Sequence, residues 1–180
     1  MTFEERPEPV PREIRELIES WPAIPAFVRD RYLTVLFAND LAMAVSTAFR
    51  DGVNLARSVF LESDVLRSNP DPEVIAEHVA GNLRESLNQH EADDGFERIV
   101  GELEARSTAF AEAWAHDETP DGADTFTFTP DVVGRMTLSY QQLSIPGSYD
   151  LTLVVWRPTD DTSRTALARL AEIASGAAEA

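Results

Sequence analysis

The sequence predicts an α+β domain in which a five-stranded antiparallel sheet carries helices on one face. Three observations support this fold class. Two short β-rich runs stand near the N-terminus, a long middle section has apolar residues at helical spacing, and three more β-rich runs precede a last helical segment. The chain has 180 residues, of which 43% are hydrophobic, so it can bury a substantial core.

The N-terminal elements are short. Residues 1–11 contain three prolines and predict an extended leader, because prolines at alternating positions are incompatible with a helix. Residues 12–20 place their apolar side chains at helical spacing and predict a short helix. The runs over residues 26–30 and 33–38 are rich in β-forming residues and are separated by a polar turn, so they predict a hairpin.

Helical segments follow the hairpin. Asn39 or Asp40 is a suitable N-cap for a helix over residues 41–49, and residues 54–62 predict a second short helix. After a proline-rich stop, a longer helix begins at Pro72, and its predicted buried stripe comprises Val74, Ile75, Val79, Leu83 and Leu87.

A further helix is expected to start at Asp93-Asp94. Its apolar face begins at Phe96 and continues at helical spacing through Phe110 to Trp114. The pattern therefore predicts one uninterrupted helical face over this part of the chain.

The C-terminal part changes to a two-residue period. Residues 125–129 alternate strictly and predict a strand. The next run alternates up to Tyr140 and then changes phase towards Leu143, which predicts a β-bulge near residues 141–142. Residues 151–156 are apolar on both faces and predict a central strand.

A final helix is predicted over residues 163–175. Two strands, then helices, then a three-stranded meander is the layout of a PAS-type domain, in which helices and sheet enclose a pocket. We therefore predict one PAS-like domain over residues 12–176, with a short tail at residues 177–180.

The charge excludes several functions. The formal net charge is −17, and all 15 basic residues are arginine, so a lysine Schiff base and a phosphate-loop lysine are excluded. Nucleic-acid binders need a basic surface, so direct contact with DNA is not expected. The sequence shows neither a secretory signal nor an apolar run long enough to cross a membrane, which predicts a cytoplasmic protein that does not bind membranes.

The sequence contains no catalytic or metal-binding motif that we can identify. It has no cysteine, and its three histidines, His78, His90 and His116, lack the spacing of a helical metal site. Glycine-rich phosphate loops and nucleophile elbows are also missing from the sequence. These observations predict a non-enzymatic protein without a metal or cofactor.

Large apolar side chains are the remaining candidates for a binding site. Ten of them are expected between the sheet and the helices: Phe37, Phe60, Phe110, Trp114, Phe126, Phe128, Met136, Leu138, Tyr140 and Trp156. Each alone is compatible with an ordinary core, but together they predict an apolar ligand pocket. Tyr140 and Trp114 could each donate a hydrogen bond to the polar end of a ligand, and Arg57 or Arg135 could meet a carboxylate at the mouth.

Several short blocks resemble the ligand-binding domain of MmyB-like transcription regulators. In the order of that family they are Pro25-Ala26-Phe27-Val28, Leu33-Thr34-Val35-Leu36 with Ala38-Asn39, Asn54 through Leu61, Trp114-Ala115-His116-Asp117, and Val133-Gly134 with Leu138, Tyr140, Leu143 and Pro146-Gly147. The resemblance extends over residues 12–174. It implies a PAS-like domain that senses a small apolar or amphipathic ligand, such as a fatty-acyl compound, and controls transcription in actinobacteria.

The resemblance also bears on partners. Members of the family, which belong to the XRE regulators, usually carry an N-terminal helix-turn-helix domain, and residues 1–11 are too short to supply one. We therefore expect a sensing domain that does not itself bind DNA, acting as a homodimer or with a related regulator. The alternative is a partner-binding module that modulates a full-length regulator through the sheet face around Val154 and Trp156 or through the terminal helices.

Overall fold

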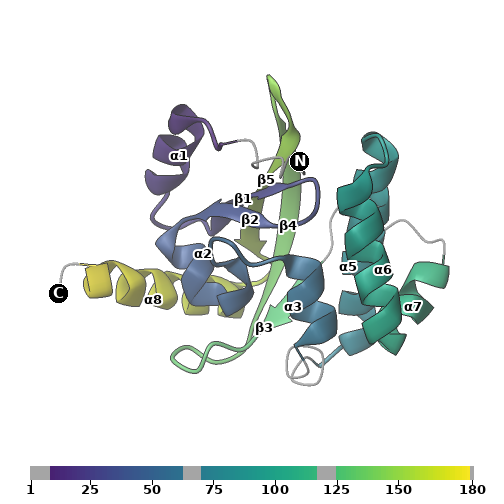
Figure 1. The fold of residues 1–180 in the computed structure, drawn as a ribbon. Coiled ribbons are helices and arrows are strands. Elements are labelled where there is room, and N and C mark those ends of the chain that lie inside the picture. The colour runs from purple at the N-terminus through teal and green to yellow at the C-terminus, as the bar shows by residue number, and fades with distance from the viewer. Residues whose placement is uncertain (1–8, 63–69, 117–124, 179–180) are drawn as a thin grey trace.

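The computed structural model describes residues 9–62, 70–116 and 125–178 (Figure 1). In chain order these residues form α1 (Arg12–Glu19), β1 (Ala26–Asp30), β2 (Val35–Ala38), α2 (Asp40–Val45), the 3₁₀ helix η1 (Thr47–Phe49), α3 (Leu55–Leu61), α5 (Pro72–Gln89), α6 (Asp94–Arg106), α7 (Thr108–Ala115), β3 (Thr125–Phe128), β4 (Met136–Ile145), β5 (Ser148–Pro158) and α8 (Asp161–Ala178).

The five strands form one antiparallel sheet in the order β2-β1-β5-β4-β3. The N-terminal hairpin and the C-terminal meander meet where β1 pairs with β5, with Phe27 opposite Val154. The predicted central strand, β5, is indeed the middle strand, which explains why both of its faces are apolar. The predicted PAS-like α+β fold is confirmed.

One face of the sheet is covered by α2, η1 and α8. One buried cluster contains Phe27, Leu138 and Trp156 from the sheet, Phe49 from η1 and Leu170 from α8. Figure 1 shows α8 running along the sheet below α2. Residues of this cluster form one side of the pocket described below.

The opposite face carries α1, which is an addition to the predicted arrangement of helices on one face. Ile18 of α1 is fully buried together with Val28, Ile145 and Leu151 of the sheet. Phe37 also lies on this face, where the guanidinium of Arg15 stands 5.3 Å from its ring centre. The predicted place of Phe37 between the sheet and the pocket-side helices was therefore wrong.

A second body is built from α3, α5, α6 and α7, which stand together beside the sheet (Figure 1). The predicted continuous face from Phe96 to Trp114 is interrupted, because Ser107 ends α6 and its hydroxyl accepts a hydrogen bond from the Phe110 backbone N–H at 3.1 Å. The turn between the two helices lets α7 pack on α5, so Phe96 and Phe110 still enter one buried cluster.

The predicted buried stripe of α5 is confirmed at four of its five positions. Leu83 is fully buried, and Ile75, Val79 and Leu87 are partly buried against the same helical cluster. Only Val74 was wrong, because it is exposed, and Ala76 and Ala80 are buried in addition to the predicted residues.

The predicted β-bulge near residues 141–142 was also wrong. Pairing between β4 and β5 is regular up to Ser144, and the irregularity lies between Ser144 and Ile145. Leu143 is half exposed, and Ile145 is buried on the α1 face. The change of phase in the sequence therefore reflects a change in which face of the strand is buried.

Polar contacts join the helical body to the sheet. The Tyr32 hydroxyl donates to Asp93 Oδ2 at 2.6 Å, and Arg31 forms an ion pair with the same carboxylate. On α5, the Ser86 hydroxyl donates to the Arg31 carbonyl oxygen at 2.6 Å. The seam between the two bodies is thus held by polar contacts at one end, whereas a cavity opens along the rest of it.

Candidate ligand-binding site

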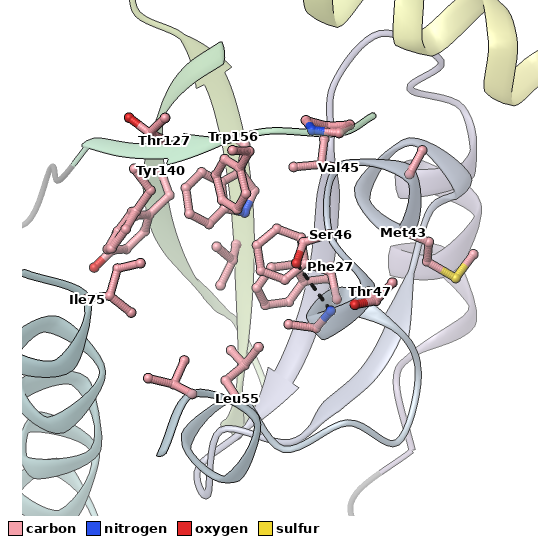
Figure 2. A pocket seen from close by; sticks show the side chains of 18 of the residues that line it. Phe27, Met43, Val45, Ser46, Thr47, Leu55, Ile75, Thr127, Tyr140 and Trp156 are labelled. Carbon is pink, nitrogen blue, oxygen red and sulfur yellow. Dashed lines mark hydrogen bonds between the residues drawn. The ribbon is translucent and has the colours of Figure 1, made fainter. Parts of the chain in front are cut away.

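A cavity of about 600 Å³ lies between the sheet, η1 and the helical body (Figure 2). Figure 2 shows Phe27, Tyr140 and Trp156 on the sheet side, with Leu55 of α3 and Ile75 of α5 facing them. The cavity therefore touches elements of both bodies. Its size falls in the range of about 300–1,000 Å³ that is typical of small-molecule sites.

Aromatic side chains form one wall of the cavity. The Trp156 ring lies 5.2 Å from both Phe128 and Tyr140, 5.4 Å from Phe49 and 5.8 Å from Phe126, measured between ring centres. Edge-to-face, tilted and stacked contacts of this kind are favourable for aromatic pairs. These five rings line the cavity and present an apolar surface.

The sequence around α2 and η1 explains how Phe49 reaches this wall. Asn39 caps α2 by accepting a hydrogen bond from the Ala42 N–H at 2.9 Å. The helix ends at Val45, and the Ser46 hydroxyl accepts a hydrogen bond from the Ala48 N–H at 3.2 Å, drawn as the dashed line in Figure 2. The chain therefore turns inward and buries Phe49 against Phe27, with ring centres 4.8 Å apart.

Polar side chains gather at one corner of the cavity. Arg29 donates to Gln142 Oε1 at 2.6 Å, and Gln142 Nε2 donates to Asn82 Oδ1 at 3.0 Å. Asn82 Nδ2 in turn donates to the Tyr140 hydroxyl at 3.2 Å. All four side chains line the cavity, and the Tyr140 hydroxyl points towards α5 in Figure 2. The chain of hydrogen bonds connects β1, β4 and α5.

Arg29 is unusual because it is a buried cation, with 7% of its surface exposed. Burial disfavours the charged form and lowers the pKa of Arg29 to about 10, although nearby Tyr140, Asp30 and Glu85 oppose the shift. The guanidinium therefore remains protonated at neutral pH. Among residues 9–62, 70–116 and 125–178, no carboxylate forms an ion pair with it.

A second buried donor belongs to the aromatic wall. The indole N–H of Trp156 has no hydrogen-bond partner among the residues that the structure describes. Buried donors without partners are uncommon in proteins because each costs desolvation free energy. Both Arg29 and Trp156 thus retain hydrogen-bonding capacity in the wall of one cavity.

The structure brings together four of the ten predicted pocket residues. Phe126, Phe128, Tyr140 and Trp156 line the cavity. Met136 and Leu138 are buried in the same core cluster but lie outside the lining. The remaining four are placed elsewhere: Phe37 on the α1 face, and Phe60, Phe110 and Trp114 inside the helical body.

The predicted polar contacts are distributed differently as well. Trp114 stacks on Phe110 at 5.3 Å and lies under the Arg84 guanidinium, away from the cavity. Arg57 donates to Glu102 Oε2 at 2.8 Å on the surface of the helical body, and Arg135 is exposed before β4. Neither arginine lines the cavity.

Several lining residues were missed by the sequence interpretation, above all Phe27, Arg29 and Asn82. The signal for Arg29 was present, since strand alternation in β1 puts it on the same face as Phe27. An arginine on the buried face of an apolar strand indicates a special role. The signal for Asn82 was weaker, because a polar residue on a helix is ordinarily solvated.

The sheet face proposed for partner binding is covered. Val154 and Trp156 are 4% and 6% exposed, beneath α2, η1 and the cavity. The prediction that they form a protein–protein interface was therefore wrong. Among the described residues, no cluster of histidine and carboxylate side chains could hold a metal ion. No helix within those same ranges has the length and apolarity required to cross a bilayer.

Three comparisons with known proteins bear on the family of this chain. A comparison with curated protein sequences gives no significant match. Among solved structures, the chain is similar to the PAS domain of BvgS from Bordetella pertussis, with 14% identity, a TM-score of 0.37, and coverage of 91% of this chain and 96% of that one. The sequence profile of the MmyB-like transcription regulator ligand binding domain matches residues 10–170. This match covers most of the chain, and the protein therefore belongs to the family of MmyB-like transcription regulator ligand-binding domains.

Proposed function

We propose that this domain senses a small amphipathic molecule with an apolar, fatty-acyl-like part, and that the cavity between the sheet and the helical body is its binding site. The observation that carries the proposal is a cavity of about 600 Å³ lined by six aromatic rings and edged by a polar corner. An apolar wall with few polar groups is the usual composition of a small-molecule site. Membership of a family of ligand-binding domains supports the same function.

The position of the cavity explains how binding could be transmitted. Its lining includes β-strand residues and also Ile75, Val79 and Asn82 of α5. A molecule that fills it contacts both bodies at once, so it favours the arrangement in which their contacts with the ligand are best. The signal would then be a shift of α5 relative to the sheet.

This role belongs to a transcription regulator of the MmyB-like family acting in the cytoplasm, without catalysis. The net charge of −17 makes direct DNA contact by these 180 residues unfavourable. Regulation of DNA binding would therefore be transmitted to another part of the regulator or to a related protein.

Native mass spectrometry of the purified protein tests the proposal. We expect a bound small molecule of defined mass, released by organic extraction, and a higher Tm when the extracted protein is returned to saturated fatty acids or alcohols of eight to sixteen carbons. A protein that carries nothing and whose Tm is unchanged across this series would contradict the proposal.

One observation supports the alternative function, a partner-binding module. Leu17 of α1 and Ile173 of α8 are large apolar side chains on the terminal helices, and each is 43% exposed. Light scattering separates the two functions: a stable dimer, or a complex with a related regulator, that is lost on Leu17→Ser and Ile173→Ser supports the alternative. A monomer that binds no relative excludes it.

A further inference from the structure

His90 lies at the polar end of the seam, where α5 ends beside the start of β5. It is the C-cap residue of α5, and its side chain is 14% exposed. Ring Nδ1 stands 2.7 Å from the Ser86 carbonyl oxygen of the same helix, and Nε2 stands 3.0 Å from the Tyr149 carbonyl oxygen of β5. The ring therefore contacts the helical body with one nitrogen and the sheet with the other.

The two carbonyl oxygens can only accept hydrogen bonds, and this decides which form of the His90 ring they favour. A neutral imidazole donates from one nitrogen and presents a lone pair at the other, whereas the imidazolium donates from both nitrogens. Whichever nitrogen kept its proton in the neutral form, the other would turn its lone pair towards a carbonyl oxygen. The geometry is therefore that of the protonated ring, which donates twice.

The charges around His90 favour the same form. Oδ1 of Asp150, in β5, lies 3.5 Å from His90 Nε2 and 3.5 Å from Nη1 of Arg31, in the turn between β1 and β2. Arg31 also forms an ion pair with Asp93 at the start of α6, and the Tyr32 hydroxyl donates to that carboxylate at 2.6 Å. One guanidinium thus faces two carboxylates, and a protonated His90 balances the second. The carbonyl groups at the end of α5 add to this preference, because a helix C-terminus favours a cation.

We propose that His90 is a proton-dependent clamp between the helical body and the sheet. The clamp is closed while the ring is protonated, and it opens as the pH rises through the range of about 5 to 8 in which histidine releases its proton. Loss of the proton removes one of the two hydrogen bonds and the attraction to Asp150, so the end of α5 is released from β5. The cavity wall would loosen as well, because α5 also carries the lining residues Ile75, Val79 and Asn82. The clamp belongs to the seam itself and does not depend on which molecule the cavity binds.

The sign of the effect on stability follows from the preference for the protonated ring. A group that is more readily protonated in the folded state contributes its full stabilisation at acid pH and loses it as the pH rises. We expect the Tm of wild type to exceed that of His90→Gln by about 3–6 °C at pH 5.5 and by less than about 1 °C at pH 8.5, since hydrogen bonds from a charged donor are the strong ones. Comparing the two proteins at each pH cancels the titration of the 32 acidic side chains that they share.

His116→Gln is the matched control. His116 is exposed, and its Nδ1 stands 2.9 Å from the Glu112 carbonyl oxygen of its own helix, so it contacts one element where His90 contacts two. The difference in Tm between wild type and His116→Gln should change by less than about 2 °C between the two pH values. A change as large as that expected for His90→Gln would overturn the proposal.

Hydrogen exchange distinguishes a clamp from a group that stabilises the whole fold. In wild type, after correction for the intrinsic rate at each pH, we expect the amides of residues 86–92 to lose protection between pH 6 and 8.5, while the amides paired between β1 and β5 keep theirs. In His90→Gln the protection of residues 86–92 should be low at both pH values.

Magnetic resonance of the wild-type ring keeps the test independent of how His90→Gln folds. With ¹⁵N-labelled histidine, His90 should show two ring N–H groups at pH 6, with cross peaks to protons of residues 148–150. A single ring N–H at pH 6, a Tm difference that is equal at both pH values, or a loss of protection that extends equally over the sheet would each overturn the clamp.

Discussion

At the scale of single residues, one buried side chain holds together three elements around the sheet. Asn39 is 8% exposed and its side-chain oxygen accepts from the N–H groups of Ala42 and Ala26 at 2.9 and 3.2 Å. Its side-chain nitrogen donates to the Ile24 carbonyl oxygen at 2.8 Å. Asn39 therefore satisfies the start of α2, the start of β1 and the loop between α1 and β1.

We predict that Asn39→Ala lowers the free energy of unfolding by about 3 kcal/mol. The variant removes a helix cap and leaves buried backbone groups without partners, and each loss costs about 1 kcal/mol or more. Urea denaturation measures the change. Asn88→Ala, at an exposed position of α5, is the matched control and should change the free energy of unfolding by less than about 0.5 kcal/mol. A similar small change in both variants would disprove the structural role of Asn39.

The two arginines that attracted attention in the sequence differ from the one in the cavity for a physical reason. Arg57 and Arg135, which were predicted to meet a ligand carboxylate at the mouth, are both on the surface. Arg29 stands inside an apolar strand, where the strand period decides that it faces inward. Position within a strand was therefore the informative signal for an arginine in the cavity wall.

At the scale of elements, α6 contains two glycines in very different surroundings. A Cβ added to Gly95 would lie 2.6 Å from Cζ of Tyr32, whose ring is held by Phe96 and whose hydroxyl is bonded to Asp93. A Cβ added to Gly101 would meet nothing within 4 Å. The same substitution in the same helix therefore has opposite consequences.

We predict that Gly101→Ala raises the free energy of unfolding by about 0.5–1 kcal/mol, because alanine is the better helix former. Gly95→Ala should lower it by about 1–3 kcal/mol, because overcrowding at Tyr32 exceeds that gain. Thermal denaturation of the two variants checks the pair. If Gly95→Ala were as stable as Gly101→Ala, the close contact between α6 and the β1–β2 hairpin would be wrong.

The elements themselves were largely predictable, and the exceptions have a common cause. The strands and their layout follow from local pattern, since strand periodicity and turn residues are properties of a short stretch of sequence. The stripe predicted for α5 missed a second packed side of this helix, because the side that faces the sheet carries polar residues such as His78 and Asn82. An apolar period cannot reveal a packed face that is partly polar.

At the scale of the whole molecule, the domain consists of a sheet with its own core and a helical body with another. The cavity lies in the seam between them, and hydrogen bonds from Asn82 and Ser86 cross that seam. Three of the eight aromatic residues predicted for the pocket lie in the helical core, because sequence cannot tell which of two cores an aromatic residue joins. The separation of the two cores leaves the cavity in which a ligand could bind.

The central claim is that an amphipathic ligand occupies the seam cavity. Ala48 of η1 lines it, so Ala48→Trp would fill part of the space, whereas Ala168→Trp places the same side chain on the exposed side of α8. The deciding measurement is calorimetric titration of both variants with dodecanoate. We predict wild-type affinity for Ala168→Trp and a loss of about tenfold or more for Ala48→Trp, since occupied space cannot hold the chain. Unchanged affinity in Ala48→Trp, in a variant that remains folded, would contradict the account.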